Sequence, residues 1–267
     1  MPENLPKSPA LTADPFSRLA RGFVNVFVNV SSLYYLAWNI LKRLPGSFKQ
    51  FRFVMEQMLS LGVSSLPLIV ITSCFVGGVA ASQATYQFSN IIPLTYLGLA
   101  VCKAVVIELG PVLTALVMAG RIGASIAAEL GTMKTNEQID AMECLALDPI
   151  RYLIIPRVVA GLVMLVALTI FADFIAMIGA WFVSVFFLGV TSNLFLSGLK
   201  LFFEPGDVFA GLIKASVFGG IITLMGCLNG MEAEGGAEGV GKATMKAVVS
   251  SCVLVLIFDF IVAALIF

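Results

Sequence analysis

Charged side chains interrupt the long apolar segments of this chain at five places: Lys103, Glu108, Asp173, Lys214 and Asp259. A charge placed in hydrocarbon costs at least ~2.5–3.5 kcal/mol even on insertion scales. Such residues either pair with one another and fix helix packing, or line a cavity where an amphipathic ligand places its polar group. For the lysines, the ammonium group can also extend to the nearer water interface. These residue types therefore predict binding rather than catalysis.

The remaining composition argues against an enzyme, a metal site and a nucleic-acid partner. The chain has no histidine, which removes the commonest general base and metal ligand. Its five cysteines form no CxxC pair and are interpreted as buried apolar side chains. Net charge is zero, and no basic run indicates nucleic acid.

One short motif resembles a nucleotide site. Residues 236–242, GAEGVGK, match the GxxxxGK pattern of a phosphate loop. However, Ala243 stands where Ser or Thr would bind magnesium, and an apolar span rather than a strand precedes the glycines. We therefore expect that this chain neither hydrolyses ATP nor holds a cofactor.

The elements that position these residues are predicted to be membrane spans. Of the 267 residues, 59% are hydrophobic and 12% are charged, whereas a soluble domain carries about 25% charged residues. The fold class predicted is an all-α integral membrane protein. Uncharged stretches and their breaks predict five spans, at about 62–86, 94–131, 150–188, 207–230 and 243–267.

The N-terminal region is interpreted as a cytoplasmic tail, residues 1–15, followed by an interfacial helix, residues 16–44. Its central part, residues 22–41, is uncharged, but arginine and lysine residues flank it on both sides. Positive charge at both ends fits neither orientation of a crossing helix. Polar residues on one stripe favour a helix lying in the interface, although a sixth span stays open.

The distribution of lysine and arginine predicts the orientation. With the N-terminus in the cytoplasm, the inner segments hold almost all of these residues outside the spans, and the outer loops hold only Lys200. The C-terminus is then expected outside. Because five spans cannot form an inverted repeat, a two-fold pathway would require a homodimer.

An acidic segment between the second and third spans, residues 132–149, is predicted to form a short helix from about residue 136 to 146. Thr135 and Gln138 match a capping box, and Asp148-Pro149 would end the helix. The helix either rests on the neighbouring spans or docks on a soluble partner. Four of its residues form an apolar stripe at helical spacing: Ile139, Met142, Leu145 and Ala146.

Three further charged residues are expected at the inner ends of the spans. Arg121 and Glu129 are eight positions apart in the second span and so lie on one face, and Arg157 lies in the third. We predict that they form an inner cluster of ion pairs with a structural role.

Residues 108–161, from ELGPVLTALVMAGRIGASIAAELG to IIPRVVAG, resemble the signature region of the MlaE-type permeases. Residues 235–251, GGAEGVGKATMKAVVSS, and the layout of five spans also match. The resemblance implies a homodimeric permease of an ABC transporter in the bacterial inner membrane. Its partners would be a cytoplasmic ATPase that binds ATP and magnesium and a periplasmic MCE-domain protein. The complex would move phospholipids between the inner and outer membranes and so affect outer-membrane lipid asymmetry.

The resemblance also implies roles for particular residues. The acidic helix, residues 135–147, would be the coupling helix that contacts the ATPase through Glu137, Asp140, Met142, Glu143 and Leu145. Glu108 and Lys214 match positions at the family's lipid pocket, and Lys103 is a further candidate for lipid contact. This chain has Ile107 where better-known members carry arginine. Asp259 is expected to be structural, and Asp173 is left undecided.

Two other functions stay open at this point. One is a permease for sterols, fatty acids or other apolar molecules, which the identity of bound lipid would distinguish. The other is a membrane scaffold without transport, in which the acidic helix would tolerate charge reversal.

Overall fold

The computed structural model describes residues 51–88, 93–201 and 204–266, and in these ranges every regular element is a helix. Five helices in this part of the chain are long and apolar enough to cross a membrane, which confirms the predicted number of spans. Their bounds are Phe51–Phe88, Leu94–Thr135, Ile150–Phe186, Pro205–Met231 and Gly236–Ile266. The expected tail and interfacial helix, residues 1–44, lie outside the described residues.

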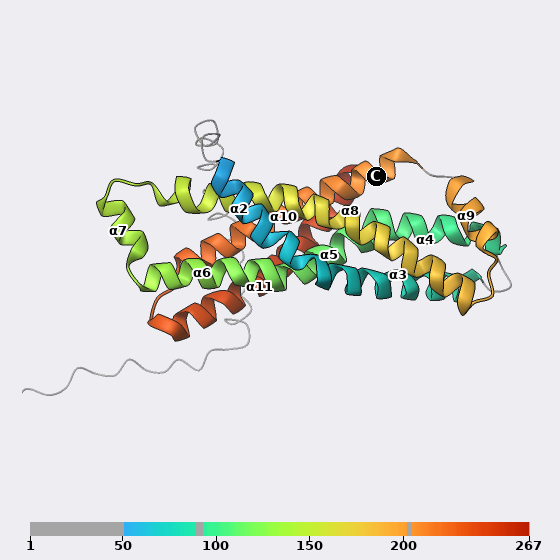
Figure 1. Ribbon diagram of the computed structural model, residues 1–267, viewed down its shortest axis with the longest axis horizontal. Coiled ribbons are helices and arrows are strands. Elements are labelled where there is room, and N and C mark those ends of the chain that lie inside the picture. Colours follow the sequence, from blue (N-terminus) through green and yellow to red (C-terminus); the bar gives the residue numbers. More distant parts are fainter. Residues whose placement is uncertain (1–50, 89–92, 202–203, 267) are drawn as a thin grey trace, which may run out of the picture.

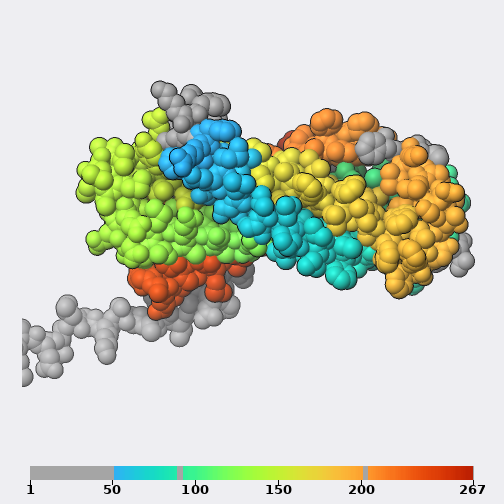
Figure 2. Space-filling view, viewed as in Figure 1, coloured from blue at the N-terminus to red at the C-terminus, as the bar shows by residue number. Residues whose placement is uncertain are grey.

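The first span is longer than the sequence predicted. It consists of α2 (Phe51–Leu61), the 3-10 turn η2 (Val63–Ser65) and α3 (Leu66–Phe88). The early part contains Arg52 and Glu56, which form an exposed i,i+4 ion pair at 3.3 Å. A prediction from hydropathy leaves such charged turns out of the span, but in the structure the helix continues through them. Figure 2 shows this span as a blue and cyan ridge beside the yellow third span, against which α3 packs.

The second span contains two π turns. After the 3-10 turn η3 (Leu94–Tyr96) come α4 (Leu97–Ala104), the π turn η4 (Val105–Leu109) and α5 (Gly110–Met118). The π turn η5 (Ala119–Gly123) and α6 (Ala124–Thr135) complete it. Pro111 follows η4, and a proline cannot donate to the carbonyl four residues earlier. A widened turn relieves that conflict within the membrane.

The same arrangement opens the third span, where the π turn η6 (Ile150–Ile154) precedes Pro156 near the start of α8 (Ile155–Phe186). The fourth span, α10 (Pro205–Met231), is the most buried of the five. It packs against α8, α6 and α11 (Gly236–Ile266). The contact with α8 is close because a Cβ at Gly219 would overlap the carbonyl oxygen of Gly161.

Two short helices lie at opposite ends of the long axis: α7 (Gln138–Cys144) and α9 (Ser192–Leu201) (Figure 1). Between the third and fourth spans the sequence predicts only a loop, at about residues 189–206, whereas the structure forms α9 there. This helix is fixed by Phe195, which is buried, and by Ser192, whose hydroxyl accepts a hydrogen bond of 3.0 Å from Trp181 Nε1. We refer below to the α7 end and the α9 end of the molecule.

Candidate functional site

The centre of the candidate site is Lys214 on α10, whose side chain is 0% exposed. Its Nζ lies 2.7 Å from Glu108 Oε1 and 2.8 Å from Asp259 Oδ1. Three spans, the second, fourth and fifth, thus meet at what we call the charge triad. A buried ammonium group is retained only with such partners, because an unpaired charge would be strongly destabilising.

Local sequence explains how the triad forms. Glu108 belongs to the π turn η4, which is widened ahead of Pro111. Gly211 lies one turn before Lys214 on α10, and a Cβ there would overlap the carbonyl oxygen of Val106. The missing side chain lets α10 approach η4 closely. The lysine can therefore reach the glutamate without a gap in the packing.

The two carboxylates of the triad differ in exposure. The Glu108 side chain is 46% exposed, whereas that of Asp259 is 22% exposed. Large apolar side chains exposed nearby in the sequence are Phe209, Ile213 and Phe260. Two carboxylates and one ammonium group give a net negative charge when both acids are ionised. An amphipathic ligand would therefore meet Glu108 first, and an anion would reach Lys214 only by replacing a carboxylate.

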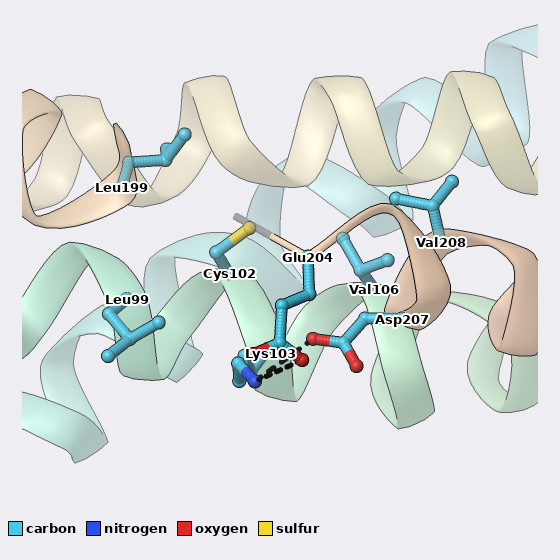
Figure 3. A pocket seen from close by; sticks show the side chains of 8 residues that line it. All are labelled: Leu99, Cys102, Lys103, Val106, Leu199, Glu204, Asp207 and Val208. Carbon is cyan, nitrogen blue, oxygen red and sulfur yellow. Dashed lines mark ion pairs between the residues drawn. The ribbon is translucent and has the colours of Figure 1, made fainter. Parts of the chain in front are cut away.

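Lys103 lies outside the triad, in a separate cluster toward the α9 end (Figure 3). Its Nζ is 3.1 Å from Asp207 Oδ2 and 3.5 Å from Glu204 Oε2. Both carboxylates come from the start of α10, so Lys103 ties α4 to the fourth span. Sequence reasoning did not predict these partners. The available signal was an acidic pair at the start of the predicted fourth span and a lysine near the start of the predicted second span.

Asp173 on α8 is also separate from the triad. Its Oδ1 is buried and has no hydrogen-bond partner within the described residues. This oxygen lies against Gly110, where a Cβ would overlap it. Gly110 and Glu108 are two positions apart, so Asp173 and Lys214 contact the second span from nearly opposite sides.

Toward the α7 end, two of the three residues predicted to cluster are paired. Arg157 is buried, with Nη2 2.7 Å from Glu129 Oε1 and Nη1 donating to the carbonyl of Leu153 at 2.7 Å. Arg121, in the π turn η5, is exposed and forms no ion pair in the part of the chain that the structure describes. The predicted cluster of three is therefore a pair.

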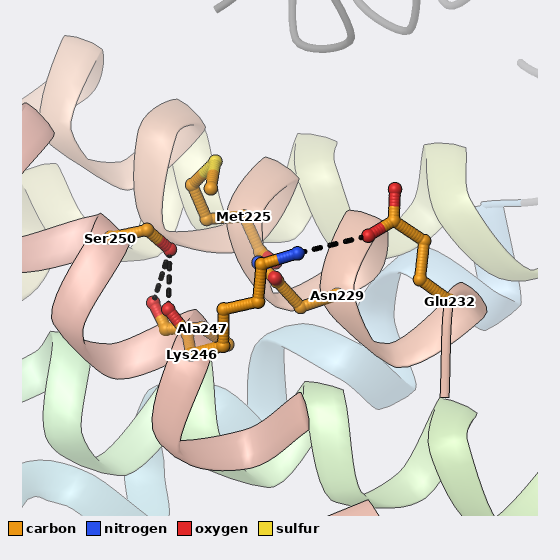
Figure 4. A network of polar contacts seen from close by, with 6 residues as sticks. All are labelled: Met225, Asn229, Glu232, Lys246, Ala247 and Ser250. Carbon is orange, nitrogen blue, oxygen red and sulfur yellow. Dashed lines mark hydrogen bonds and ion pairs between the residues drawn. The ribbon is translucent and has the colours of Figure 1, made fainter. Parts of the chain in front are cut away.

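A second contact near the α7 end joins α10 to α11 (Figure 4). Lys246 Nζ lies 3.2 Å from Glu232 Oε2, across the tight connection between the two helices. Asn229 donates through Nδ2 to the carbonyl of Met225 at 2.8 Å. These contacts position the fifth span, which carries Asp259.

The acidic helix α7 is shorter than predicted, and the predicted capping box is wrong. Thr135 ends α6, and its hydroxyl donates to the carbonyl of Gly131 at 3.0 Å. A hydroxyl that bonds back within its own helix cannot cap the next one. The cap residue is Glu137, in a left-handed conformation with φ 58° and no side-chain hydrogen bond.

The C-terminal end of α7 has the hydrogen bonds of a Schellman motif. Leu147 N–H donates to the carbonyl of Met142 at 3.0 Å, and Ala146 N–H donates to that of Glu143 at 2.9 Å. Ala146 has φ 58°, a conformation that glycine adopts more readily. Both ends of α7 thus have a non-glycine residue in the left-handed region.

The predicted apolar stripe of α7 is divided between two environments. Ile139 is buried and holds the helix on the bundle, and Met142 is half-buried. Leu145 is 73% exposed, and Leu147 beyond the helix is also exposed. Asp140 pairs with Lys134 at 2.6 Å, and Glu137 and Glu143 are exposed. These exposed residues form an acidic and apolar surface at the α7 end.

Residues 54–265 match the family model described as Permease MlaE. A probable ABC transporter permease protein of Synechocystis is 41% identical over 241 residues, covering 90% of this chain and 92% of that relative. One of Rickettsia prowazekii is 41% identical over 214 residues, covering 80% and 83%. The chloroplastic protein TRIGALACTOSYLDIACYLGLYCEROL 1 of Arabidopsis thaliana is 36% identical over 228 residues, covering 85% of this chain and 65% of that protein.

Proposed function

This multi-pass membrane protein belongs to the MlaE permease family, and we propose that it moves phospholipids between the inner and outer membranes of a bacterium. It would act as a homodimer with a cytoplasmic ABC ATPase, which binds ATP and magnesium, and a periplasmic MCE-domain protein. The name of the Arabidopsis relative refers to a glycerolipid, which supports a lipid substrate. The single observation that carries the proposal is the charge triad, embedded in apolar spans and partly exposed through Glu108.

In this proposal the lipid lies with its acyl chains on apolar side chains and its headgroup beside the triad. Phe209, Ile213 and Phe260 are large, apolar and exposed, as acyl-chain contacts must be. The headgroup meets the exposed carboxylate of Glu108. A phosphate can then replace Glu108 as the partner of Lys214, so that the buried ammonium group always keeps a counter-charge.

The α7 end would face the cytoplasm and carry the ATPase. Exposed Leu145 and Leu147 suit an apolar pocket on that partner, and Glu137, Asp140 and Glu143 suit basic residues around it. A helix connects α7 to the triad, because α6, α5 and the π turn η4 are parts of one span. ATP-dependent movement of α7 would therefore reach Glu108 through the second span, with the energy supplied by the partner's nucleotide states.

The test compares Lys214→Met with Lys103→Met in the purified complex. We would measure phospholipid bound to the complex by mass spectrometry and transfer of labelled phospholipid from proteoliposomes. Loss of a charge-assisted contact to phosphate predicts a fall of about tenfold or more for Lys214→Met. Lys103→Met should stay near wild type. A folded Lys214→Met complex that binds and transfers phospholipid normally would contradict the proposal.

One observation favours a second candidate, a permease for uncharged lipids such as sterols. Lys214 already has two carboxylate partners, and Ile107 supplies no further cation beside Glu108. The same mass spectrometry distinguishes the two functions, since uncharged lipid in place of phospholipid would support the second. A complex that binds neither, and from which no ATPase co-purifies, would indicate a scaffold.

A further inference from the structure

A groove separate from the charge triad lies between α3, α5 and α8, with a volume of about 350 Å³. This volume is within the range of small-molecule sites. Ile71 and Phe75 at its rim are strongly exposed, so the groove opens on the surface of the helix bundle. Its other apolar lining residues are Val76, Leu109, Leu113, Val117, Ala172 and Ala176.

Two residues that are largely buried, Ser73 and Thr114, bring hydroxyl groups to this apolar groove. Ser73 on α3 is 7% exposed and Thr114 on α5 is 4% exposed. Within the described residues neither hydroxyl forms a hydrogen bond. The neighbouring Thr72, by contrast, donates to the carbonyl of Leu68 at 2.9 Å, as serine and threonine in helices usually do. Neither hydroxyl oxygen is among the fully buried atoms that lack a partner in the described residues, so both are open to the groove, where a ligand could supply the missing hydrogen bonds.

A third polar group, on α8, lies behind one wall of the groove without lining it. Asp173 Oδ1 is buried without a hydrogen-bond partner in the described ranges, and it lies against Gly110, which lines the groove. Two helices therefore each bring to the groove one hydroxyl without a hydrogen-bond partner among the described residues, and a carboxyl group lies buried behind Gly110. Packing alone does not account for this convergence, since apolar residues of similar size would fill the positions at no such cost.

The charges around the groove restrict what it can bind. No lysine or arginine lines it, and no cation pairs with Asp173 in the described part of the chain. A phosphate group would therefore have no counter-charge in the groove. Ser73 and Gly110 also lie far from both ends of their spans, at a depth where a charged headgroup is disfavoured.

We propose that this groove binds one uncharged lipid that carries a hydroxyl group on a long apolar chain. The chain lies against Phe75, Leu113 and Val117, and the ligand enters sideways from the bilayer. Its hydroxyl exchanges hydrogen bonds with Ser73 and Thr114. Diacylglycerol and long-chain alcohols share this chemistry. The site is distinct from the charge triad and does not depend on the transport of phospholipid.

The experiment uses the full-length protein in nanodiscs with three diazirine-labelled probes: a diacylglycerol, a long-chain alcohol and a phosphatidylcholine. After irradiation, mass spectrometry locates the labelled peptides. We expect labelling around residues 71–76 and 109–117 by one or both uncharged probes, and little by phosphatidylcholine. Which of the two labels more strongly identifies the source of the ligand.

The matched variants are Ser73→Ala/Thr114→Val, which removes both hydroxyls at nearly constant volume, and Thr72→Val. Thr72 also lines the groove, but its hydroxyl already bonds to its own helix. The double variant should reduce labelling of the groove about tenfold, through loss of two hydrogen bonds. Thr72→Val should leave it near wild type, and Val117→Trp should abolish it by filling the groove. The elution profile of each variant is checked to confirm that the protein is folded.

Three results would overturn the proposal. Equal labelling of the groove by phosphatidylcholine would exclude selection for an uncharged lipid. Labelling that persists in the double variant would show that the two hydroxyl groups do not bind the ligand. Efficient disulfide formation between two copies carrying Val117→Cys, with no lipid labelling, would show that a second copy covers the groove.

Discussion

Removal of one carboxylate from the charge triad should destabilise the protein by an amount set by its burial. After Asp259→Asn, Lys214 stays buried and keeps only Glu108, which is half exposed and 2.7 Å away. The loss is one buried charge-assisted contact, which is worth ~1.5–3 kcal/mol. Either substitution leaves an amide oxygen that can still accept from Lys214, but Glu108→Gln removes a more exposed charge. We expect that change to cost below ~1 kcal/mol.

The assay is reversible unfolding of the detergent-solubilised protein in increasing SDS, followed by far-ultraviolet circular dichroism. Glu204→Gln serves as the control, because that carboxylate is largely exposed and its contact to Lys103 is longer. Combining Asp259→Asn with Lys214→Met measures the coupling, expected at ~0.5–3 kcal/mol. A larger loss for Glu108→Gln than for Asp259→Asn, or no coupling, would refute the argument that burial of Lys214 sets the energies.

Three further predictions concern the α7 end. Asp140→Lys/Glu143→Lys should abolish co-purification of ATPase activity with the folded protein, since it reverses the exposed charge of α7; full activity would exclude α7 as the docking surface. Ala146→Gly should slow hydrogen exchange in α7 by relieving about 1 kcal/mol of left-handed strain, and faster exchange would contradict that reasoning. Glu129→Gln should lower stability in the same SDS assay by ~1 kcal/mol or less, because the Glu129 side chain is 52% exposed and the new amide oxygen can still accept from the buried guanidinium of Arg157.

Hydropathy was sufficient to predict the spans but not their ends. A window of apolar residues detects where a helix lies in hydrocarbon, and it stops at Arg52 and Glu56 although the helix continues through them. The pairing of Glu129 with Arg157 could be expected from their similar depth in adjacent spans. Several charged residues lie at a similar depth, however, so depth alone does not determine which residues form an ion pair. Lys103 was a candidate for lipid contact, as was Glu108, and its ion-pair partners in the fold, Glu204 and Asp207, were not predicted from the sequence.

Other errors came from signals that are local and ambiguous. Thr135 and Gln138 have the spacing of a capping box, but the hydroxyl of Thr135 bonds to a carbonyl of α6. Sequence does not decide between these two acceptors when one helix ends where the next begins. The π turns η4 and η6 were also not predicted from the sequence. In both, a proline near the start of the following helix was the available signal.

The unequal exposure of the two carboxylates gives the proposed exchange of counter-charges a direction. For a phosphate to bind Lys214, one carboxylate must leave, and the departing group should be the one that water can solvate. Glu108 meets this requirement at 46% exposed, whereas Asp259 at 22% would move from a less solvated position. Glu108 also lies in a π turn, a form of helix that converts to α-helix by a shift of one residue in the hydrogen bonding. In the proposed mechanism, Asp259 therefore stays with Lys214 as a fixed partner, while Glu108 is the carboxylate that a lipid headgroup and a moving second span can displace.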